Sequence, residues 1–257
     1  MSLIGAPIWA DLAASDMNAE RSFYAGLLGW EYGESHPDAG GWIMATAEGK
    51  PAAGMAPRPA QMPVSSWTVY FGCTDIDAAV ARATQLGATV YMPPMSVDVG
   101  GVHMCSIAVL ADPGGAVFGL SEPGEHKGFG LTSGRGSVAW YELLSRDLDA
   151  ATDFYRELLG AKVTKADVPM DYRLVGVAEG ADFAGLMAMP DEVPAEAPSY
   201  WSIYFEVDDA AAAVDFASES GATVIFGPQT MPDIGTIANV LDPEHAAVSV
   251  LEPPRGE

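Results

Sequence analysis

The sequence repeats itself, and this repeat constrains the fold more than any other feature. In each copy an aspartate is followed seven positions later by Phe-Tyr and then by Leu-Leu-Gly, over residues 16–29 and 147–160. The aromatic segment at residues 67–71 likewise recurs at residues 201–205. Because motifs that recur in the same order mark a duplicated structural element, the two halves of the chain should share one fold.

The duplication predicts two domains joined by a short linker. The first domain spans residues 4–122 and the second spans residues 137–254. The linker, residues 123–136, contains five glycines in 14 residues, which is too many for a regular helix or strand. We therefore expect two similar domains rather than one large one.

Each half should contain two modules, and each module should be a strand, a helix and three further strands. Aspartates suited to helix capping occur at positions 16, 75 and 147, so helices should begin there and, by the repeat, near residue 208. Four such modules give an α+β fold in which helices cover one face of each sheet. In the first half the strands are expected at residues 8–14, 41–47, 52–57, 67–73, 88–91, 106–110 and 116–121.

The charge of the chain argues against several functions. Its 257 residues include 35 acidic and 12 basic side chains, which gives a net charge of −23. Such a surface repels nucleic-acid phosphates and anionic lipids, and it attracts cations. The two cysteines, Cys73 and Cys105, are too few for a disulfide framework, and no segment is typical of a membrane span. We therefore expect a cytoplasmic protein with no nucleic-acid or membrane partner.

The module pattern is closed in each half by an Asp-Pro turn, Asp112-Pro113 and Asp242-Pro243, and it resembles the vicinal oxygen chelate superfamily. That superfamily includes glyoxalase I, extradiol dioxygenases, fosfomycin-resistance enzymes and bleomycin-resistance proteins. The tandem arrangement is similar to the two-domain glyoxalase-like proteins of actinobacteria. The resemblance implies four βαβββ modules whose curved mixed sheets form two glyoxalase-like domains. It also implies a monomer, because one chain supplies what single-domain relatives assemble by dimerising.

Enzymes of this superfamily bind a divalent metal at strand positions that face into the curved sheet. Here the resemblance places indoles, hydroxyls and glycines at those positions, and these are poor ligands. The four histidines are not paired at metal-site spacing, and only His103, before a strand, could reach a cleft; the others are His36, His126 and His245. We therefore expect no metal and no other cofactor. The ligand positions are Trp9, Gly54, Thr68 and Gly119, then Trp140, Gly185, Ser202 and Ser249.

Side chains on the same strand faces as these positions should line a ligand cleft, because a strand alternates its faces with period two. Trp9 and Trp140 would offer walls for stacking, or would fill the space that a metal takes. Asp11 and Glu142 recur two positions later, and a carboxylate there needs water, a donor or a cationic ligand. The predicted ligand-binding residues are Trp9, Asp11, Thr68, Tyr70, Trp140, Glu142, Ser202, Tyr204 and Glu206, whereas Trp67 and Trp201 should point beneath the helices.

Three functions remain open at this point. The first is a metal-independent small-molecule binding protein of the glyoxalase/bleomycin-resistance type, with a cationic or aromatic ligand, which the acidic charge favours. The second is a glyoxalase- or hydroxylase-like enzyme in which Asp11 or Glu142 acts as acid or base. The third is a structural module whose clefts are filled by side chains. No catalytic residue is assigned beyond these two carboxylates.

Overall fold

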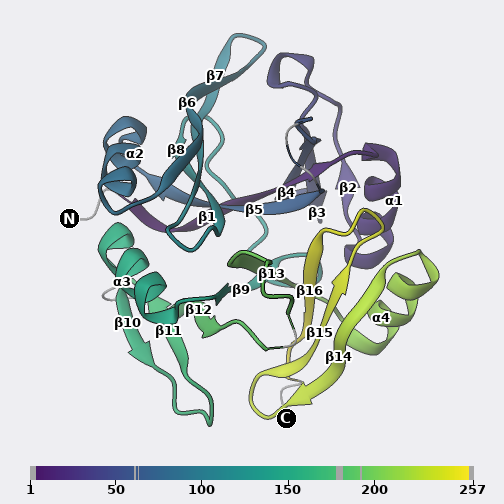
Figure 1. The fold of residues 1–257 in the computed structure, drawn as a ribbon. Helices are drawn as coiled ribbons and strands as arrows, with labels where there is room; N and C mark the ends of the chain where they lie inside the picture. The colour runs from purple at the N-terminus through teal and green to yellow at the C-terminus, as the bar shows by residue number, and fades with distance from the viewer. Residues whose placement is uncertain (1–3, 61, 63, 178–181, 192, 255–257) are drawn as a thin grey trace. The chain divides into compact units, whose positions relative to one another are not determined.

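The structure, a computed structural model, describes residues 4–60, 62, 64–177, 182–191 and 193–254 (Figure 1). A strand, a helix and three strands follow one another four times, so the predicted α+β fold is confirmed. The first module consists of β1 (Ile4–Ala14), α1 (Met17–Leu28), β2 (Glu31–Tyr32), the 3-10 turn η1 (Pro37–Ala39), β3 (Ile43–Ala47) and β4 (Lys50–Pro57). The second consists of β5 (Ser66–Cys73), α2 (Ile76–Gln85), β6 (Thr89–Val99), β7 (Val102–Ala111) and β8 (Val117–Pro123).

The second half repeats this order. The third module consists of β9 (Val138–Ser145), α3 (Leu148–Leu159), β10 (Lys162–Lys165), β11 (Tyr172–Gly176) and β12 (Asp182–Ala188). The fourth consists of β13 (Tyr200–Glu206), α4 (Ala210–Glu219), β14 (Thr223–Met231), β15 (Gly235–Leu241) and β16 (Ala247–Glu252).

The strands form two mixed eight-stranded sheets of the same topology. Their orders are β2-β3-β4-β1-β5-β8-β7-β6 and β10-β11-β12-β9-β13-β16-β15-β14. The first strand of each module pairs in parallel with the last strand of the same module, and the three strands that follow each helix pair antiparallel with one another in sequence order. In every module the first strand therefore lies beside the last strand, which carries one of the positions that the resemblance assigned to the metal. These positions are Gly54, Gly119, Gly185 and Ser249.

All four helices begin at an aspartate, as the sequence predicted. Asp16, Asp75 and Asp147 each accept a hydrogen bond from a backbone amide of the first turn, which satisfies a donor that the helix itself leaves open. The fourth helix begins at Ala210 with Asp209 as its cap, one residue beyond the predicted start. Gly29, just after α1, has φ +73°, the left-handed conformation that ends a helix at little cost for glycine.

Some strands differ in extent from the prediction. The segment predicted as a strand at residues 88–91 is part of β6, which runs to Val99. Of the three strands expected after the first helix, the one to which the sequence assigned no residues is the short β2. Pro93 and Pro94 lie within β6, where the missing amide donors are tolerated because β6 is the edge strand of its sheet and its register shifts there.

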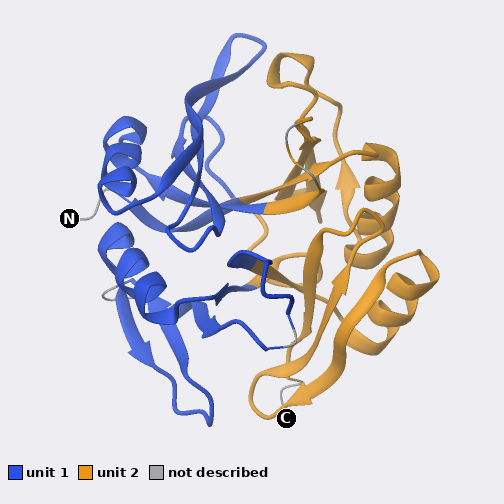
Figure 2. Cartoon of the chain, viewed as in Figure 1, with its two compact units in different colours: residues 1–9, 68–128, 140–201 blue, residues 10–67, 129–139, 202–257 orange. Residues whose placement is uncertain are grey.

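The chain forms two compact units, and each combines modules from both halves of the sequence (Figure 2). Unit 1 contains the described residues of 1–9, 68–128 and 140–201, and therefore α2 and α3. Unit 2 contains those of 10–67, 129–139 and 202–257, and therefore α1 and α4. The predicted domains at 4–122 and 137–254 describe the sequence repeat, and that division stays a prediction.

The recurring Trp, Tyr and Asp-Pro residues form a buried hydrogen-bond relay in each unit. In unit 2 the Trp67 indole donates to the Tyr24 hydroxyl at 2.9 Å, and that hydroxyl donates to Asp242 at 2.8 Å. Unit 1 repeats this with Trp201, Tyr155 and Asp112 at 2.8 and 3.0 Å. Trp67 and Trp201 are 7% and 6% exposed, which confirms their predicted place beneath the helices.

Unit 2 has two carboxylic acids beside this relay that unit 1 lacks. Glu20 on α1 is fully buried, and burial followed by the charges of Asp242 and Glu244 raises its pKa to about 9. Glu20 is therefore a neutral acid at physiological pH. Glu244 accepts hydrogen bonds of 2.6 Å from the Ser15 and Asp16 amides and from the Ser65 hydroxyl. The equivalent residues of the other repeat are Ala151 and Gly114.

Candidate ligand-binding site

The first candidate site lies in unit 2, where β1 and β4 run side by side. Asp11 is the register partner of Gly54. The indole Nε1 of Trp42 donates a hydrogen bond of 3.0 Å to Asp11 Oδ1, and both side chains are half-buried. A Cβ on Gly54 would overlap the carboxylate oxygen and the indole nitrogen, so the glycine makes room for them. We call Asp11 and Trp42 the Asp11 cluster.

The second candidate site lies in unit 1 and repeats this geometry on β9 and β12. Glu142 is the register partner of Gly185. The Tyr172 hydroxyl donates to Glu142 Oε1 at 2.9 Å and accepts from Trp140 Nε1 at 2.9 Å. A Cβ on Gly185 would overlap the Tyr172 phenol. We call Trp140, Glu142 and Tyr172 the Glu142 cluster; all three side chains are half-buried.

Burial, and then the charge of Glu142, raises the pKa of Tyr172 above its ordinary value. The phenol therefore stays protonated and acts as a donor to the carboxylate. The Trp42 indole is likewise a neutral donor to Asp11. A neutral donor fixes the direction of a carboxylate without cancelling its charge, so both clusters orient a negative charge inside a partly desolvated surface.

Trp42 and Tyr172 were not among the predicted site residues. They occupy equivalent places in the two repeats, at positions 42 and 172, and both are aromatic. Their offset of 130 is one less than the 131 that separates Asp16 from Asp147, so the motif offset alone pairs Trp42 with Arg173. A search that allowed one residue of slip between the repeats would have found them. Strand alternation alone could not, because it orders residues within one strand and these two lie outside β1 and β9.

In unit 1 the predicted residues on β5 are buried. Tyr70 is the register partner of Gly119, and a Cβ on that glycine would overlap the Tyr70 ring. Tyr70 and Thr68 are 6% and 7% exposed. Their side chains therefore belong to the packed interior of the unit, and their role in ligand binding stays a prediction.

The equivalent residues on β13 are also held by neighbours, here in unit 2. Ser202 and Ser249, two positions that the resemblance assigned to the metal, are joined by a hydrogen bond of 2.9 Å between their hydroxyls. Tyr204 is 5% exposed. The half-buried Glu206 accepts a hydrogen bond of 3.1 Å from the Gly134 amide. A ligand-binding role for these residues also stays a prediction.

Trp9 is buried, with its ring edge-on to the His126 imidazole at a centroid distance of 4.3 Å. Burial lowers the pKa of His126, so the imidazole is neutral at physiological pH. Trp9 belongs to unit 1 and Asp11 to unit 2. The predicted cleft shared by these two residues therefore stays a prediction.

The residues at the implied metal positions do not fit a divalent ion. Longer side chains at Gly54, Gly119 and Gly185 would overlap their neighbours, so these positions cannot offer a carboxylate. Within the described part of the chain, no group of three or more His, Cys, Asp or Glu side chains could hold a metal. His103, the best single candidate in the sequence, is exposed and lies 3.4 Å from an Asp98 carboxylate oxygen.

Two family models match the chain, one in each half. A glyoxalase-like domain matches residues 8–121, and the glyoxalase/bleomycin resistance protein/dioxygenase superfamily matches residues 137–250. The chain belongs to this superfamily. The resemblance read from the Asp, Phe-Tyr and Asp-Pro pattern is thereby confirmed.

Curated relatives are similar to this chain over nearly its whole length. CFP32 of Mycobacterium tuberculosis, which carries a provisional glyoxylase name, is 34% identical over 256 residues, covering 97% of this chain and 95% of that protein. The anthracycline biosynthesis protein DnrV of Streptomyces peucetius is 34% identical over 269 residues, covering 96% and 93%. The superfamily assignment thus holds for both halves together.

Solved structures show the same glyoxalase/dioxygenase fold. The Mn(II)-bound glyoxalase of Novosphingobium aromaticivorans has a TM-score of 0.67 at 15% identity, covering 98% of this chain and 83% of that one. The 2,3-dioxygenase LapB of Pseudomonas sp. KL28 has a TM-score of 0.66 at 13% identity, covering 98% and 93%. At these identities the likeness establishes the fold alone. No helix in the described residues is long and apolar enough to cross a membrane.

Proposed function

We propose that this superfamily member binds a small cationic or aromatic compound at the Asp11 and Glu142 clusters, without a metal. One observation carries the proposal. In both repeats a half-buried carboxylate, held by a neutral aromatic donor, lies over a glycine at a position where the family places a metal ligand. The same replacement of a metal site by an oriented charge thus occurs twice.

The physical properties of the clusters support a cationic or aromatic ligand. A carboxylate in a partly desolvated place attracts a cation more strongly than one in open water. The aromatic faces of Trp42, Trp140 and Tyr172 add stacking area and attract positive charge. The net charge of −23 adds a long-range field of the same sign.

The name of one relative supports an aromatic ligand and suggests a probe. DnrV is named for anthracycline biosynthesis. Anthracyclines are flat aromatic compounds that carry an amino sugar, so one molecule combines both chemical features that the clusters favour. We therefore choose doxorubicin as the probe.

The test is calorimetric titration of the full chain with doxorubicin. We expect binding by the wild type and at least tenfold weaker binding by Glu142→Gln or Asp11→Asn, with unfolding temperatures close to wild type. Glu34→Gln removes one exposed charge elsewhere and should bind normally. Cluster variants that bind like wild type but melt much lower would show that these carboxylates are structural, and the proposal would fail.

The second candidate function is acid–base catalysis at the Glu142 cluster. The observation that favours it is the Tyr172–Glu142 hydrogen bond, because it holds a carboxylate, the candidate general base, beside a hydroxyl that can orient it toward a substrate. In that case Glu142→Gln and Tyr172→Phe would bind a compound that the wild type converts, but would lose its turnover. Asp11 would take the same role in unit 2.

We propose further that the chain works as a monomer in the cytoplasm. It contains both copies of the repeat, and its cysteines, Cys73 and Cys105, are buried and not joined in a disulfide, which suits a reducing compartment. Sedimentation at several protein concentrations tests the first statement. A concentration-dependent dimer would contradict it.

A further inference from the structure

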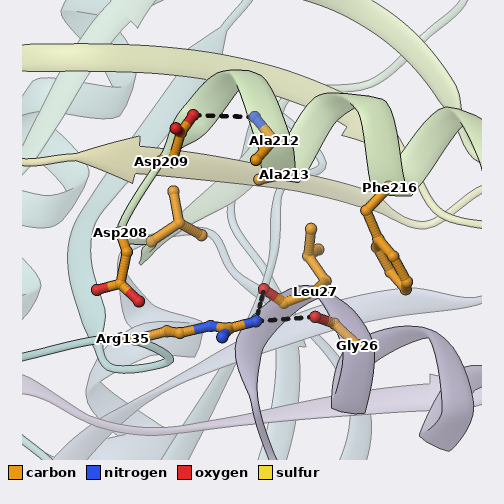
Figure 3. A pocket seen from close by; sticks show the side chains of 9 residues that line it. Gly26, Leu27, Arg135, Asp208, Asp209, Ala212, Ala213 and Phe216 are labelled. Atoms are coloured by element: carbon orange, nitrogen blue, oxygen red, sulfur yellow. Dashed lines mark hydrogen bonds between the residues drawn. The ribbon is translucent and has the colours of Figure 1, made fainter.

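Unit 2 contains a cavity of about 180 Å³ between the end of α1 and α4 (Figure 3), and none of the residues that line it belongs to the Asp11 or Glu142 cluster. Its floor is apolar and consists of Leu27, Val207 and Ala213, all of which are buried. Since a water molecule takes about 30 Å³ in the liquid, the space equals about six waters. That is below the range of about 300–1,000 Å³ for drug-sized ligands and suits a molecule the size of leucine.

The two ends of the cavity differ in chemistry. Figure 3 shows Arg135 and Asp208 toward one end and the Phe216 ring at the other. One amino group of Arg135 donates to the Gly26 and Leu27 carbonyls at 2.9 and 3.2 Å, which holds the guanidinium at the end of α1. Its other N–H groups make no hydrogen bond to any residue that the structure describes. A ligand with a polar head and an apolar tail matches this gradient.

The polar end of a ligand in this cavity should carry both a negative and a positive charge. Asp208 is exposed and forms no hydrogen bond or ion pair with any described residue, Arg135 included. Asp208 and Asp209 both line the cavity. A simple carboxylate would gain from Arg135 but would be repelled by these two groups, and a simple amine would be attracted by them but repelled by Arg135. A zwitterion satisfies both groups, with its carboxylate on the guanidinium and its ammonium on the Asp208 carboxylate.

The other repeat shows that this space is not a requirement of the fold. Residues 157 and 82 of unit 1 are the repeat equivalents of Gly26 and Phe216. There Glu157 and Arg82 form an ion pair with an N···O distance of 2.9 Å between α3 and α2. In unit 2 the glycine and the aromatic ring replace that ion pair, and Asp208 replaces Thr74.

We propose that this cavity binds a free amino acid with an apolar side chain, the carboxylate on Arg135, the ammonium on Asp208 and the side chain against Phe216 and Leu27. The site is independent of the Asp11 and Glu142 clusters. Because the cavity is small, an aliphatic or single-ring side chain is the class that it admits. A second, small-molecule site of this kind would give the chain an input separate from the ligand of its clusters.

The test is calorimetric titration of the full chain with L-leucine, 4-methylpentanoate and 3-methylbutylamine. The last two share the leucine side chain but lack the ammonium or the carboxylate, and we expect each to bind at least tenfold more weakly. In Asp208→Asn the order should change, because removing the negative charge favours 4-methylpentanoate relative to leucine. Equal binding of the three compounds by the wild type would overturn the zwitterion assignment.

The matched control transplants the ion pair of unit 1. The double variant Gly26→Glu/Phe216→Arg fills the cavity with the side chains that the fold already accommodates in the other repeat, so it should melt near the wild-type temperature. It should lose leucine binding and keep doxorubicin binding. Absence of leucine binding to the wild type at millimolar concentrations, or unchanged leucine binding by the double variant, would overturn this proposal. Neither result would bear on the proposed ligand binding at the Asp11 and Glu142 clusters.

Discussion

Tyr24 and Asp242 lie 218 residues apart in the sequence and are joined by a buried hydrogen bond of 2.8 Å in unit 2. Tyr24→Phe removes the hydroxyl and leaves both Asp242 and the Trp67 indole without this partner. We expect a loss of about 1–3 kcal/mol in the free energy of unfolding, the usual cost of an unsatisfied buried group. Urea denaturation followed by fluorescence measures it.

Tyr155→Phe is the matched variant in unit 1, because Tyr155 bridges Trp201 and Asp112 in the same way. Its loss should be similar in size. A wild-type unfolding midpoint in either variant would mean that the relay contributes nothing to stability.

Glu20 should make the protein less stable as the pH rises. Its pKa is 4.5 in the unfolded chain and about 9 in the folded one. Between these values only the folded state keeps the proton, so the free energy of unfolding falls by at most about 1.4 kcal/mol per pH unit. This stabilisation is complete below pH 4.5 and gone above about pH 9.

Glu20→Gln keeps a neutral side chain of the same shape at every pH. Its unfolding free energy should therefore fall less steeply between pH 6 and pH 9, and it should be more stable than wild type at pH 9. Urea titrations at four pH values measure the slope. Parallel slopes for Glu20→Gln and wild type, with Glu34→Gln as the exposed-acid control, would refute a buried proton at Glu20.

Gly185→Ala should displace Tyr172 from Glu142. The added Cβ would overlap the hydroxyl end of the phenol, which must then shift away from the glycine. Overpacking of this kind costs about 1–3 kcal/mol of stability. Adding Tyr172→Ala removes the overlap, so the double variant should lose less than the sum of the two single variants. Strict additivity in this mutant cycle would show that the glycine and the tyrosine do not compete for space.

His126 should titrate below its ordinary range because burial lowers its pKa. The neutral ring is then favoured by folding, so this contribution to stability is complete above about pH 6.5 and is lost as the pH falls through the lowered value. Proton NMR of the imidazole should give a midpoint below 6.5. The Trp9 indole signal, 4.3 Å away between ring centroids, should shift with the same midpoint, and His126→Gln should abolish that shift.

Much of the fold could be predicted because its signals are local. The capping aspartates Asp16, Asp75 and Asp147 act within one helical turn, so a sequence pattern is enough to find them. The length of β6 was not predicted because prolines are accepted only at a sheet edge, and edge position depends on the other strands. The composition of the two compact units was not predicted either, since a repeat does not reveal which copies pack together.

The candidate site was predicted in part. Strand alternation predicted that Asp11 and Glu142 face a cleft, and the structure has both side chains half-buried. The resemblance treated Gly54 and Gly185 only as replaced metal ligands. The structure shows that these glycines provide the space in which the carboxylates and their donors lie. That role depends on the register between neighbouring strands, which one strand's sequence does not contain.

The makeup of the two units affects how the duplicated copies can diverge. Unit 2 takes Glu20 from the first copy and Glu244 from the second, whereas unit 1 has Ala151 and Gly114 at the equivalent places. The two acids interact, although they are encoded in different copies of the duplicated segment. A mutation in one copy therefore changes the environment of the other, and neither copy can drift alone. Residues that interact across the two copies, such as Glu20 and Glu244, should therefore change together. Compensating mutations should be sought between the halves of the chain rather than within one half.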